Sequence, residues 1–229
     1  MKFISKIKTI VATLGLLALA VGASASPTNF SFTGSFVKDN DVKLFNFVAD
    51  GSSTVRLISY SWAGGTQSNN NVVAAGGFDP ILALFDSRGG QIAQNDDSRD
   101  LTVGSCGASA VGINGGARWD ACLELFLDAG PYTVGLAQFD NAPVELKLAN
   151  GFEHDANPTF TSKYCSKKIF CVLDPEDQWD FEGRTANWAV DLMHVEQANV
   201  VTVPEPASLA LWAMGVFGMI AAKRRRKQV

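Results

Sequence analysis

The fold is decided by residues 119–139, which read WDACLELFLDAGPYTVGLAQF. In its first half every odd-numbered position, from Trp119 to Leu127, is apolar. In its second half Tyr132, Val134 and Leu136 alternate with smaller or polar residues, and Asp128-Ala129-Gly130 between the halves favours a turn. Because successive side chains of a strand point to opposite faces, this pattern predicts two strands joined by a turn, each with one buried face.

The same alternation recurs from residue 27 to residue 202. About eight or nine short strands separated by Gly, Asn and Asp turns predict an all-β fold, an antiparallel β-sandwich or jelly roll. Residues 150–184 form a polar insertion, either a loop or a short hairpin. The other strand-like segments carry Phe30, Phe32 and Phe36; Phe45 and Phe47; Ile58, Tyr60 and Trp62; residues 81–85; residues 91–94; Val144, Leu146 and Leu148; and Trp188, Val190 and Leu192 in a last strand running to about Val201.

The charges are distributed unevenly along the 229 residues. The whole chain has 19 Lys and Arg, 23 Asp and Glu and a net charge of −4. Three of the basic residues lie in the first eight positions and five in the last seven, which leaves 11 bases against 23 acids between them, a balance of −12. This acidic middle excludes nucleic acid as a partner, because phosphate binding needs clustered Lys and Arg. With 47% hydrophobic residues, the chain is also too apolar to be disordered.

The N-terminal segment has the features of a secretory signal. Lys2, Lys6 and Lys8 precede an uncharged apolar run over 9–21, and Ala23-Ser24-Ala25 supplies the small residues that signal peptidase accepts. We therefore predict a signal peptide over 1–25. The alternative is an N-terminal membrane anchor, for which the apolar run is short.

The C-terminal segment has three parts: Pro204-Glu205-Pro206, an uncharged stretch over 207–222, and a basic tail. Sixteen residues form a helix of about 24 Å, slightly shorter than the ~30 Å hydrocarbon core. Local thinning of the bilayer, or snorkelling of the basic side chains, covers this deficit, so residues 207–222 are predicted to be a transmembrane helix. The positive-inside rule places the tail in the cytoplasm and residues 26–202 across the inner membrane. The tail consists of Lys223, Arg224, Arg225, Arg226 and Lys227.

These three parts over residues 203–229 resemble the PEP-CTERM sorting signal of Gram-negative bacteria. The resemblance rests on Pro204-Glu205-Pro206-Ala207-Ser208-Leu209 and on the Arg-rich tail. It implies a membrane-anchored precursor, removal of the tag by an exosortase, a mature form at the cell surface or outside the cell, and an association with exopolysaccharide and biofilm. A plain tail anchor is the alternative, although it would not need the Pro-Glu-Pro motif.

Residues 30–148 also resemble the bacterial pre-peptidase C-terminal type of β-sandwich, and more closely a related domain that carries a Phe-Asp-Pro motif. Such modules are non-catalytic, so the resemblance implies a protein that is not an enzyme. It does not extend to the segment from Cys106 to Cys122 or to the insertion. Its marks are Asp39-Asn40-Asp41-Val42, Gly76-Gly77-Phe78-Asp79-Pro80, Leu84-Phe85-Asp86, Asn95-Asp96-Asp97 and the run from Leu127 to Val134.

Four cysteines in an exported chain suggest two disulfides, because the space outside the inner membrane is oxidising. Four cysteines allow three pairings, of which Cys106 with Cys122 and Cys165 with Cys171 are the local choice. Free or metal-binding thiols are the alternative, but no His lies at the spacing that a zinc site needs.

No catalytic motif stands out. The two histidines, His154 and His194, are expected to be structural or solvated, and the chain has no Gly-x-Ser-x-Gly or His-Glu-x-x-His run. A calcium site is the sharper hypothesis, because carboxylate clusters on loops supply the oxygen ligands that calcium takes. The same residues could equally cap turns. The candidate ligands are Asp39, Asp41, Asp79, Asp96 and Asp97.

Three functions follow from the sequence. The first is a non-enzymatic surface or extracellular-matrix protein that is delivered by exosortase and associated with exopolysaccharide. The second is a carbohydrate-binding or calcium-dependent adhesive module, in which aromatic side chains stack on sugars. The third is a secreted hydrolase built on paired carboxylates. The aromatic candidates are Trp62, Trp119, Trp179 and Trp188.

Overall fold

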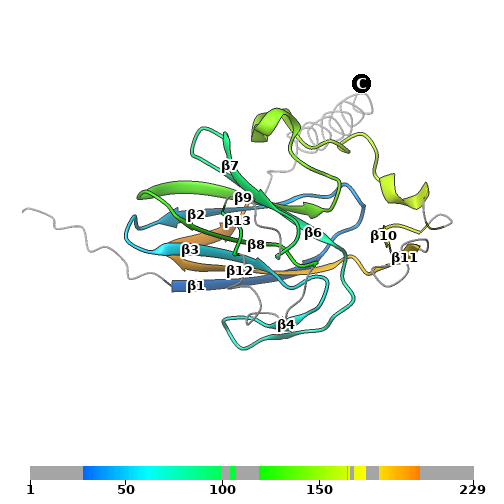
Figure 1. The fold of residues 1–229 in the computed structure, drawn as a ribbon, viewed down its shortest axis with the longest axis horizontal. Helices are drawn as coiled ribbons and strands as arrows, with labels where there is room; N and C mark the ends of the chain where they lie inside the picture. The colour runs from blue at the N-terminus through cyan, green and yellow to red at the C-terminus, as the bar shows by residue number, and fades with distance from the viewer. Residues whose placement is uncertain are drawn as a thin grey trace, which may run out of the picture.

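The computed structural model describes residues 28–98, 104–106, 119–163, 165, 168–173 and 181–201. Two antiparallel sheets lie face to face and are the main layers of this part of the chain (Figure 1). The expectation of an all-β fold is therefore confirmed. The predicted signal peptide over 1–25 and the predicted sorting segment over 203–229, with its helix over 207–222, lie outside the described residues.

Nine strands form the two main sheets. All neighbouring strands within each sheet are antiparallel. The first sheet has the order β1 (Thr28–Ser35), β12 (Asn187–Val195), β3 (Thr54–Ser59), β8 (Cys122–Phe126). The second has the order β13 (Gln197–Val200), β2 (Lys43–Ala49), β9 (Gly130–Gln138), β6 (Pro80–Phe85), β7 (Gln91–Asn95).

The two strands of the 119–139 stretch belong to different sheets. β8 pairs with β3, whereas β9 pairs with β2 and β6. The turn predicted at Asp128-Ala129-Gly130 therefore carries the chain from one layer to the other. Trp119 lies before β8 rather than in it, but Leu123 and Leu127 are buried in the core as the alternation predicts.

The core lies between the sheets and is rich in aromatic side chains. The Phe45 ring meets the Trp188 ring edge to face at 5.8 Å, and Phe36 stacks on Phe78 at 5.1 Å. Burial of each side chain of this size contributes about 1.5–3 kcal/mol to the free energy of unfolding. The inner faces supply Phe45, Phe47, Leu57, Leu82, Leu84, Leu123, Val134, Leu136, Trp188, Val190 and Leu192.

Both sheets are also partly covered on their outer faces. Phe152 and Leu148 pack over the second sheet, against Ile81, Ala83 and Phe85. As a result all six residues of β6 are buried, which explains the continuous apolar run at 81–85. A small hairpin of β4 (Gly65–Thr66) and β5 (Val72–Val73) is joined to the first sheet, where Val73 packs against a cluster that includes Ile58 and Tyr60.

The strand predicted at Val144, Leu146 and Leu148 is wrong. The segment forms two short 3₁₀ helices, η2 (Val144–Leu146) and η3 (Leu148–Asn150). Glu145 and Leu146 have left-handed φ angles of 51° and 56°, which turn the chain away from an extended path. Three apolar residues two apart are too weak a signal to show such a break.

The single last strand predicted up to Val201 is two strands. The chain leaves the first sheet after β12 and joins the second as β13. His194, with a φ angle of 60°, sits one residue before the end of β12, and Glu196 N donates to Val48 O of the second sheet at 2.9 Å. The apolar alternation continues through the crossing, so it hides the change of partner.

The insertion over 150–184 contains both a helix and a hairpin. Its described parts include η4 (Phe160–Lys163) and the pair β10 (Cys171–Leu173) and β11 (Phe181–Gly183). Asp39 fixes this insertion to the sandwich. Its carboxylate accepts hydrogen bonds from Thr161 N at 2.9 Å, Thr161 Oγ1 at 2.7 Å and Phe170 N at 2.6 Å.

The four cysteines form the two local disulfides, Cys106 with Cys122 and Cys165 with Cys171. We expect the double variant Cys106→Ala/Cys122→Ala to lose about 3 kcal/mol of unfolding free energy, because the bond closes a loop of 16 residues. Urea denaturation of the variant and the wild type measures the loss. An unchanged midpoint would show that this bond contributes nothing to stability.

Candidate functional site

Carboxylates gather at one end of the sandwich, where β6 begins and β7 and β9 end. Pro80 at the start of β6 pairs with Gln138 at the end of β9, and Leu82 pairs with Asn95 at the end of β7. Asp79 precedes β6, and Asp96-Asp97 follows β7. Together with Asp120, which precedes β8, these residues are called the acidic end below: Asp79, Asp96, Asp97 and Asp120.

Asp120 is fully buried and organises the loop after β3. Its Oδ1 accepts from Ser59 Oγ at 2.9 Å and from Trp62 N at 3.0 Å, and its Oδ2 accepts from Ala63 N at 2.9 Å. Burial raises the pKa of this carboxyl to about 6, although the hydrogen bonds oppose the shift. Asp120 could not be predicted from the sequence, because nothing in its position shows that it is buried.

This raised pKa predicts a pH dependence of stability. The folded carboxyl binds its proton more tightly than the unfolded one, whose pKa is near 3.8, so its stabilising contribution is complete below pH 3.8 and is lost as the pH rises through about 6. We expect the unfolding free energy of Asp120→Asn to fall less than that of the wild type between pH 4 and pH 7. Urea denaturation at several pH values tests this, and equal slopes would contradict it.

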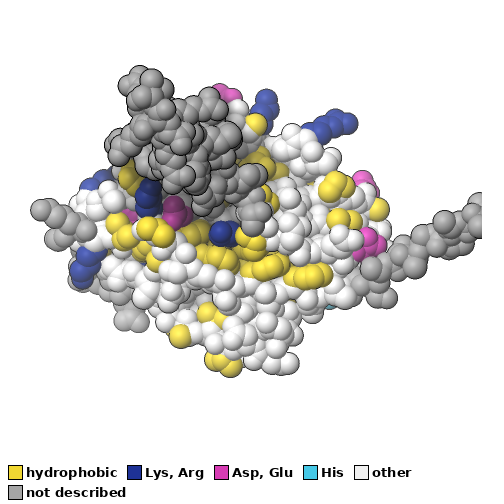
Figure 2. Space-filling model, turned by 180° about the vertical axis from the view of Figure 1, so that it is seen from behind, with side chains coloured by type: hydrophobic (Ala, Val, Ile, Leu, Met, Phe, Trp, Pro, Cys, Tyr) yellow, Lys and Arg dark blue, Asp and Glu magenta, His cyan; other side chains and the backbone are white. Residues whose placement is uncertain are grey.

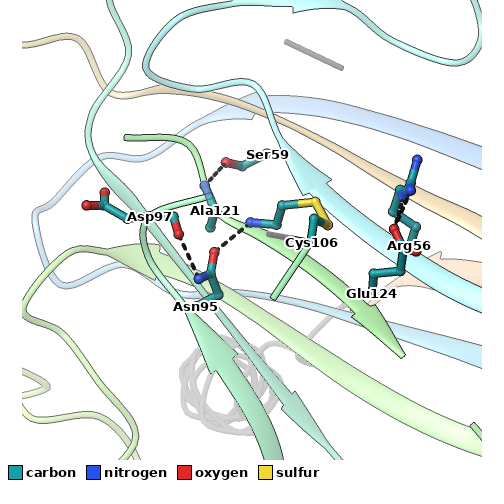
Figure 3. Close-up of a disulfide and its surroundings, with 8 residues drawn as sticks. Arg56, Ser59, Asn95, Asp97, Cys106, Ala121 and Glu124 are labelled. Carbon is teal, nitrogen blue, oxygen red and sulfur yellow. Dashed lines mark hydrogen bonds and ion pairs between the residues drawn. A yellow bond between two sulfur atoms is a disulfide. The ribbon is translucent and has the colours of Figure 1, made fainter. Parts of the chain in front are cut away.

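Asn95 connects the two sheets beside the Cys106–Cys122 disulfide (Figure 3). Its Oδ1 accepts from Cys122 N at 2.8 Å, and its Nδ2 donates to Asp97 O at 2.8 Å. The first of these bonds joins the end of β7 to the start of β8, and the second holds the loop that carries Asp96 and Asp97. The acidic end is therefore attached to a covalently braced part of the fold.

Asp79 differs from the other buried carboxylates. It is 7% exposed, and its Oδ1 has no hydrogen-bond partner within the described residues. Burial raises its pKa well above the ordinary range, and the charges of Asp97, Asp96 and Asp120 raise it further. Four neutral atoms of the described residues are likewise buried without a partner: Ser61 Oγ, Gln91 Oε1, Gln138 Oε1 and Trp188 Nε1. Of their residues, Gln138 lies at the end of β9, beside the start of β6, and Ser61 lies in the loop after β3.

Asp39 and Asp41 accept hydrogen bonds elsewhere in the fold and do not belong to the acidic end. Asp39 fixes the insertion, as described above, and Asp41 Oδ2 accepts from Val37 N at 2.6 Å and Lys38 N at 2.9 Å, which is turn chemistry. Of the five predicted calcium ligands, the acidic end thus contains Asp79, Asp96 and Asp97. Among the described side chains, no three or more His, Cys, Asp or Glu residues are grouped closely enough to hold a metal ion.

The histidine and tryptophan candidates are mostly packed against other groups. His154 stacks on Phe160 at 4.0 Å, and the exposed His194 makes a hydrogen bond of 3.0 Å between Nδ1 and Thr54 O. Trp188 is buried in the core. Trp62 packs on Trp119 at 5.9 Å, and the Arg184 guanidinium lies 3.5 Å from the centre of the Trp62 ring. Trp179 lies outside the described residues.

A match to a known family falls at the C-terminal end of the chain. Residues 202–227 match the PEP-CTERM protein-sorting motif. This motif contains the predicted Pro204-Glu205-Pro206 and the basic tail from Lys223 to Lys227. The PEP-CTERM motif indicates exosortase-dependent sorting to the outside of the cell and implies exosortase as the processing partner. No curated protein is similar enough to the chain to be matched to it.

The PEP-CTERM motif is consistent with export and with a membrane-anchored precursor. In the part of the chain that the structure describes, no helix is both long and apolar enough to cross a bilayer. The helix predicted over 207–222 lies outside that part and stays a prediction, as does the signal peptide. The match covers the PEP-CTERM segment alone, so the resemblance of residues 30–148 to a pre-peptidase C-terminal domain also stays a prediction.

Proposed function

We propose that the chain is a non-enzymatic exported surface protein, which exosortase sorts and processes through residues 203–229 and which acts with exopolysaccharide in the extracellular matrix. The PEP-CTERM motif at residues 202–227 carries this proposal. The signal peptide over 1–25 begins the route, signal peptidase removes it, and the precursor stays in the inner membrane until the tag is removed.

The disulfides and charge of residues 26–202, called the ectodomain below, support a location outside the cell. The two disulfides of the ectodomain are stable in an oxidising compartment. Between Ser26 and Val203 there are 11 basic and 22 acidic residues, a balance of −11 that favours solubility. Figure 2 shows Lys and Arg side chains dispersed over one face, not gathered in a patch that would bind nucleic acid.

The buried carboxylates also support a structural role. Asp39, Asp120 and Asp191 are fully buried and accept hydrogen bonds that hold loops in place. Such groups maintain a fold, whereas a catalytic acid or base must reach a substrate. The proposal therefore assigns them to positioning of the loops around the two sheets.

Fractionation of cells tests the proposal. The full chain is produced in a Gram-negative strain that has an exosortase and in the same strain with the exosortase gene deleted. We expect a shortened form at the surface or in the medium of the first strain and a full-length precursor in the inner membrane of the second. The same form in the same fraction of both strains would contradict the proposal. Co-purification of the mature form with the strain's exopolysaccharide tests the matrix role, and its absence from that material would remove it.

A further inference from the structure

The acidic end contains a carboxylate whose bonding is incomplete. Every other fully buried carboxylate in the described residues is well supplied with donors: Asp39 and Asp120 as given above, and Asp191 from Tyr60 Oη at 3.1 Å, Gln67 Nε2 at 3.0 Å and Ser68 N at 2.6 Å. Asp79 is almost as deeply buried, yet its Oδ1 has no partner among these residues. A buried carboxylate oxygen left in this way destabilises a fold unless something else binds it.

Gln138 and Ser61, whose side-chain oxygens are also buried without a partner, belong to segments whose backbones lie beside residues 77–80. Gln138 pairs with Pro80, and Phe139 N donates to the Asp79 carbonyl at 2.8 Å, so the end of β9 lies beside Asp79. Gly77 lies against Ser61, because a Cβ atom on Gly77 would come 2.3 Å from Ser61 O. Gln138 Oε1 and Ser61 Oγ are 1% and 2% exposed by residue and have no partner in the described residues.

Arg184 attracts the charge of Asp79 and lowers the pKa of its carboxyl. Arg184 donates Nε to Gly77 O at 2.7 Å and Nη2 to Trp62 O at 3.0 Å, and its guanidinium lies on the Trp62 ring. Its effect on the pKa of Asp79 is smaller than that of Asp97, Asp96 or Asp120, each of which raises this pKa. The acidic end thus has an excess of negative charge and of oxygen acceptors.

We propose that the acidic end binds a calcium ion through Asp79, with the side-chain oxygens of Gln138 and Ser61 and the adjacent Asp96-Asp97 loop completing the ligand set. Calcium takes six to eight oxygens and accepts carboxylates, amides and water together. Among the described residues no three or more His, Cys, Asp or Glu side chains are grouped closely enough to hold a metal ion, so the proposed site depends on amide, hydroxyl, backbone and water oxygens besides Asp79. Calcium fits these ligands better than zinc, because structural zinc sites are built from Cys and His and the four cysteines are disulfide-bonded.

The rival explanation is that Asp79 holds a proton at neutral pH. Burial and the neighbouring carboxylates favour this state in the absence of a cation. The two explanations predict different effects of calcium on stability. If Asp79 holds a proton, calcium changes the stability of neither the wild type nor Asp79→Asn. With a bound ion, the substitution removes a stabilisation that depends on calcium.

Thermal unfolding of the mature chain from the producing strain tests the proposal. We expect about 1 mM calcium chloride to raise the Tm of the wild type by about 3–6 °C over that in chelator, the shift that a ligand at roughly ten times its Kd gives in a domain of this size. In Asp79→Asn the shift is absent, and its Tm in chelator equals or exceeds that of the wild type, because the unpartnered charge is gone.

Asp128→Asn is the matched control. It removes the same charge from an exposed residue near the start of β9, at the opposite end of that strand from Gln138, and should keep the calcium shift. Equilibrium dialysis of the wild type against radioactive calcium measures binding directly, even if Asp79→Asn does not fold. A wild type that binds no calcium and shows no Tm shift would overturn the proposal. An equal shift in Asp79→Asn would also overturn it.

Discussion

Asp39→Ala is expected to lower the free energy of unfolding by about 3–5 kcal/mol, one of the largest losses that a single substitution in the ectodomain can cause. The carboxylate is fully buried and accepts three hydrogen bonds from Thr161 and Phe170. Alanine would leave these buried donors unpaired, and each costs about 1–3 kcal/mol. Because both partners belong to the insertion, we expect its attachment to the sandwich to fail before the two sheets separate.

Urea denaturation and limited proteolysis together measure this effect. The variant should have a lower midpoint, and its first cleavage should fall within 150–184. Asp41→Ala is the control, since Asp41 is only half-buried and caps a turn through Val37 N and Lys38 N, so its loss should be about 1 kcal/mol. Equal losses for the two variants would contradict the role given to Asp39.

Substitution of the Pro-Glu-Pro motif is expected to stop maturation altogether. In a strain with an exosortase, Pro204→Ala/Glu205→Ala/Pro206→Ala should accumulate as full-length precursor in the inner membrane, with no mature form at the surface. The expected physical reason is that proline cannot continue a helix, so Pro204 and Pro206 are predicted to keep the chain extended and open to an enzyme. Alanines would allow the helix predicted over 207–222 to extend upstream. Immunoblots of membrane and surface fractions measure the two forms.

A change to the basic tail separates processing from topology. Replacing the five residues from Lys223 to Lys227 by Gln removes the charges that the positive-inside rule predicts to hold the tail in the cytoplasm, so we expect the precursor to lose its predicted orientation. Asp128→Asn, in the ectodomain, is the control for both changes and should be processed like the wild type.

Normal surface delivery of the variant Pro204→Ala/Glu205→Ala/Pro206→Ala would contradict the role given to the Pro-Glu-Pro motif.

Period-two patterns predicted the sheets well and their connections poorly. Phe45 and Phe47 on β2, and Val134 and Leu136 on β9, face the core as the sequence indicates. The pattern could not show that β12 ends and β13 begins near Glu196, because alternation is the same in both sheets. It also failed at 144–148, where left-handed residues at Glu145 and Leu146 replace a strand by 3₁₀ turns.

Only part of the candidate site could be predicted from the sequence. The sequence predicts five calcium ligands, Asp39, Asp41, Asp79, Asp96 and Asp97, without separating them. The fold uses Asp39 and Asp41 for other hydrogen bonds. Burial and the direction of a side chain decide between these uses, and neither can be read from residue type. Gln138 and Ser61 could not be predicted for the same reason, since only the pairing of β6 with β9 and the close approach of Gly77 bring their backbones beside residues 77–80.

The intact mass of the mature protein shows whether exosortase removes the C-terminal segment. We expect the form recovered from the surface or medium of an exosortase-containing strain to lack the signal peptide over 1–25 and the segment that follows Pro204-Glu205-Pro206. In the matched strain without exosortase, the protein should keep this segment up to Val229. A surface form that retains the basic tail from Lys223 to Lys227 in the presence of exosortase would contradict the account.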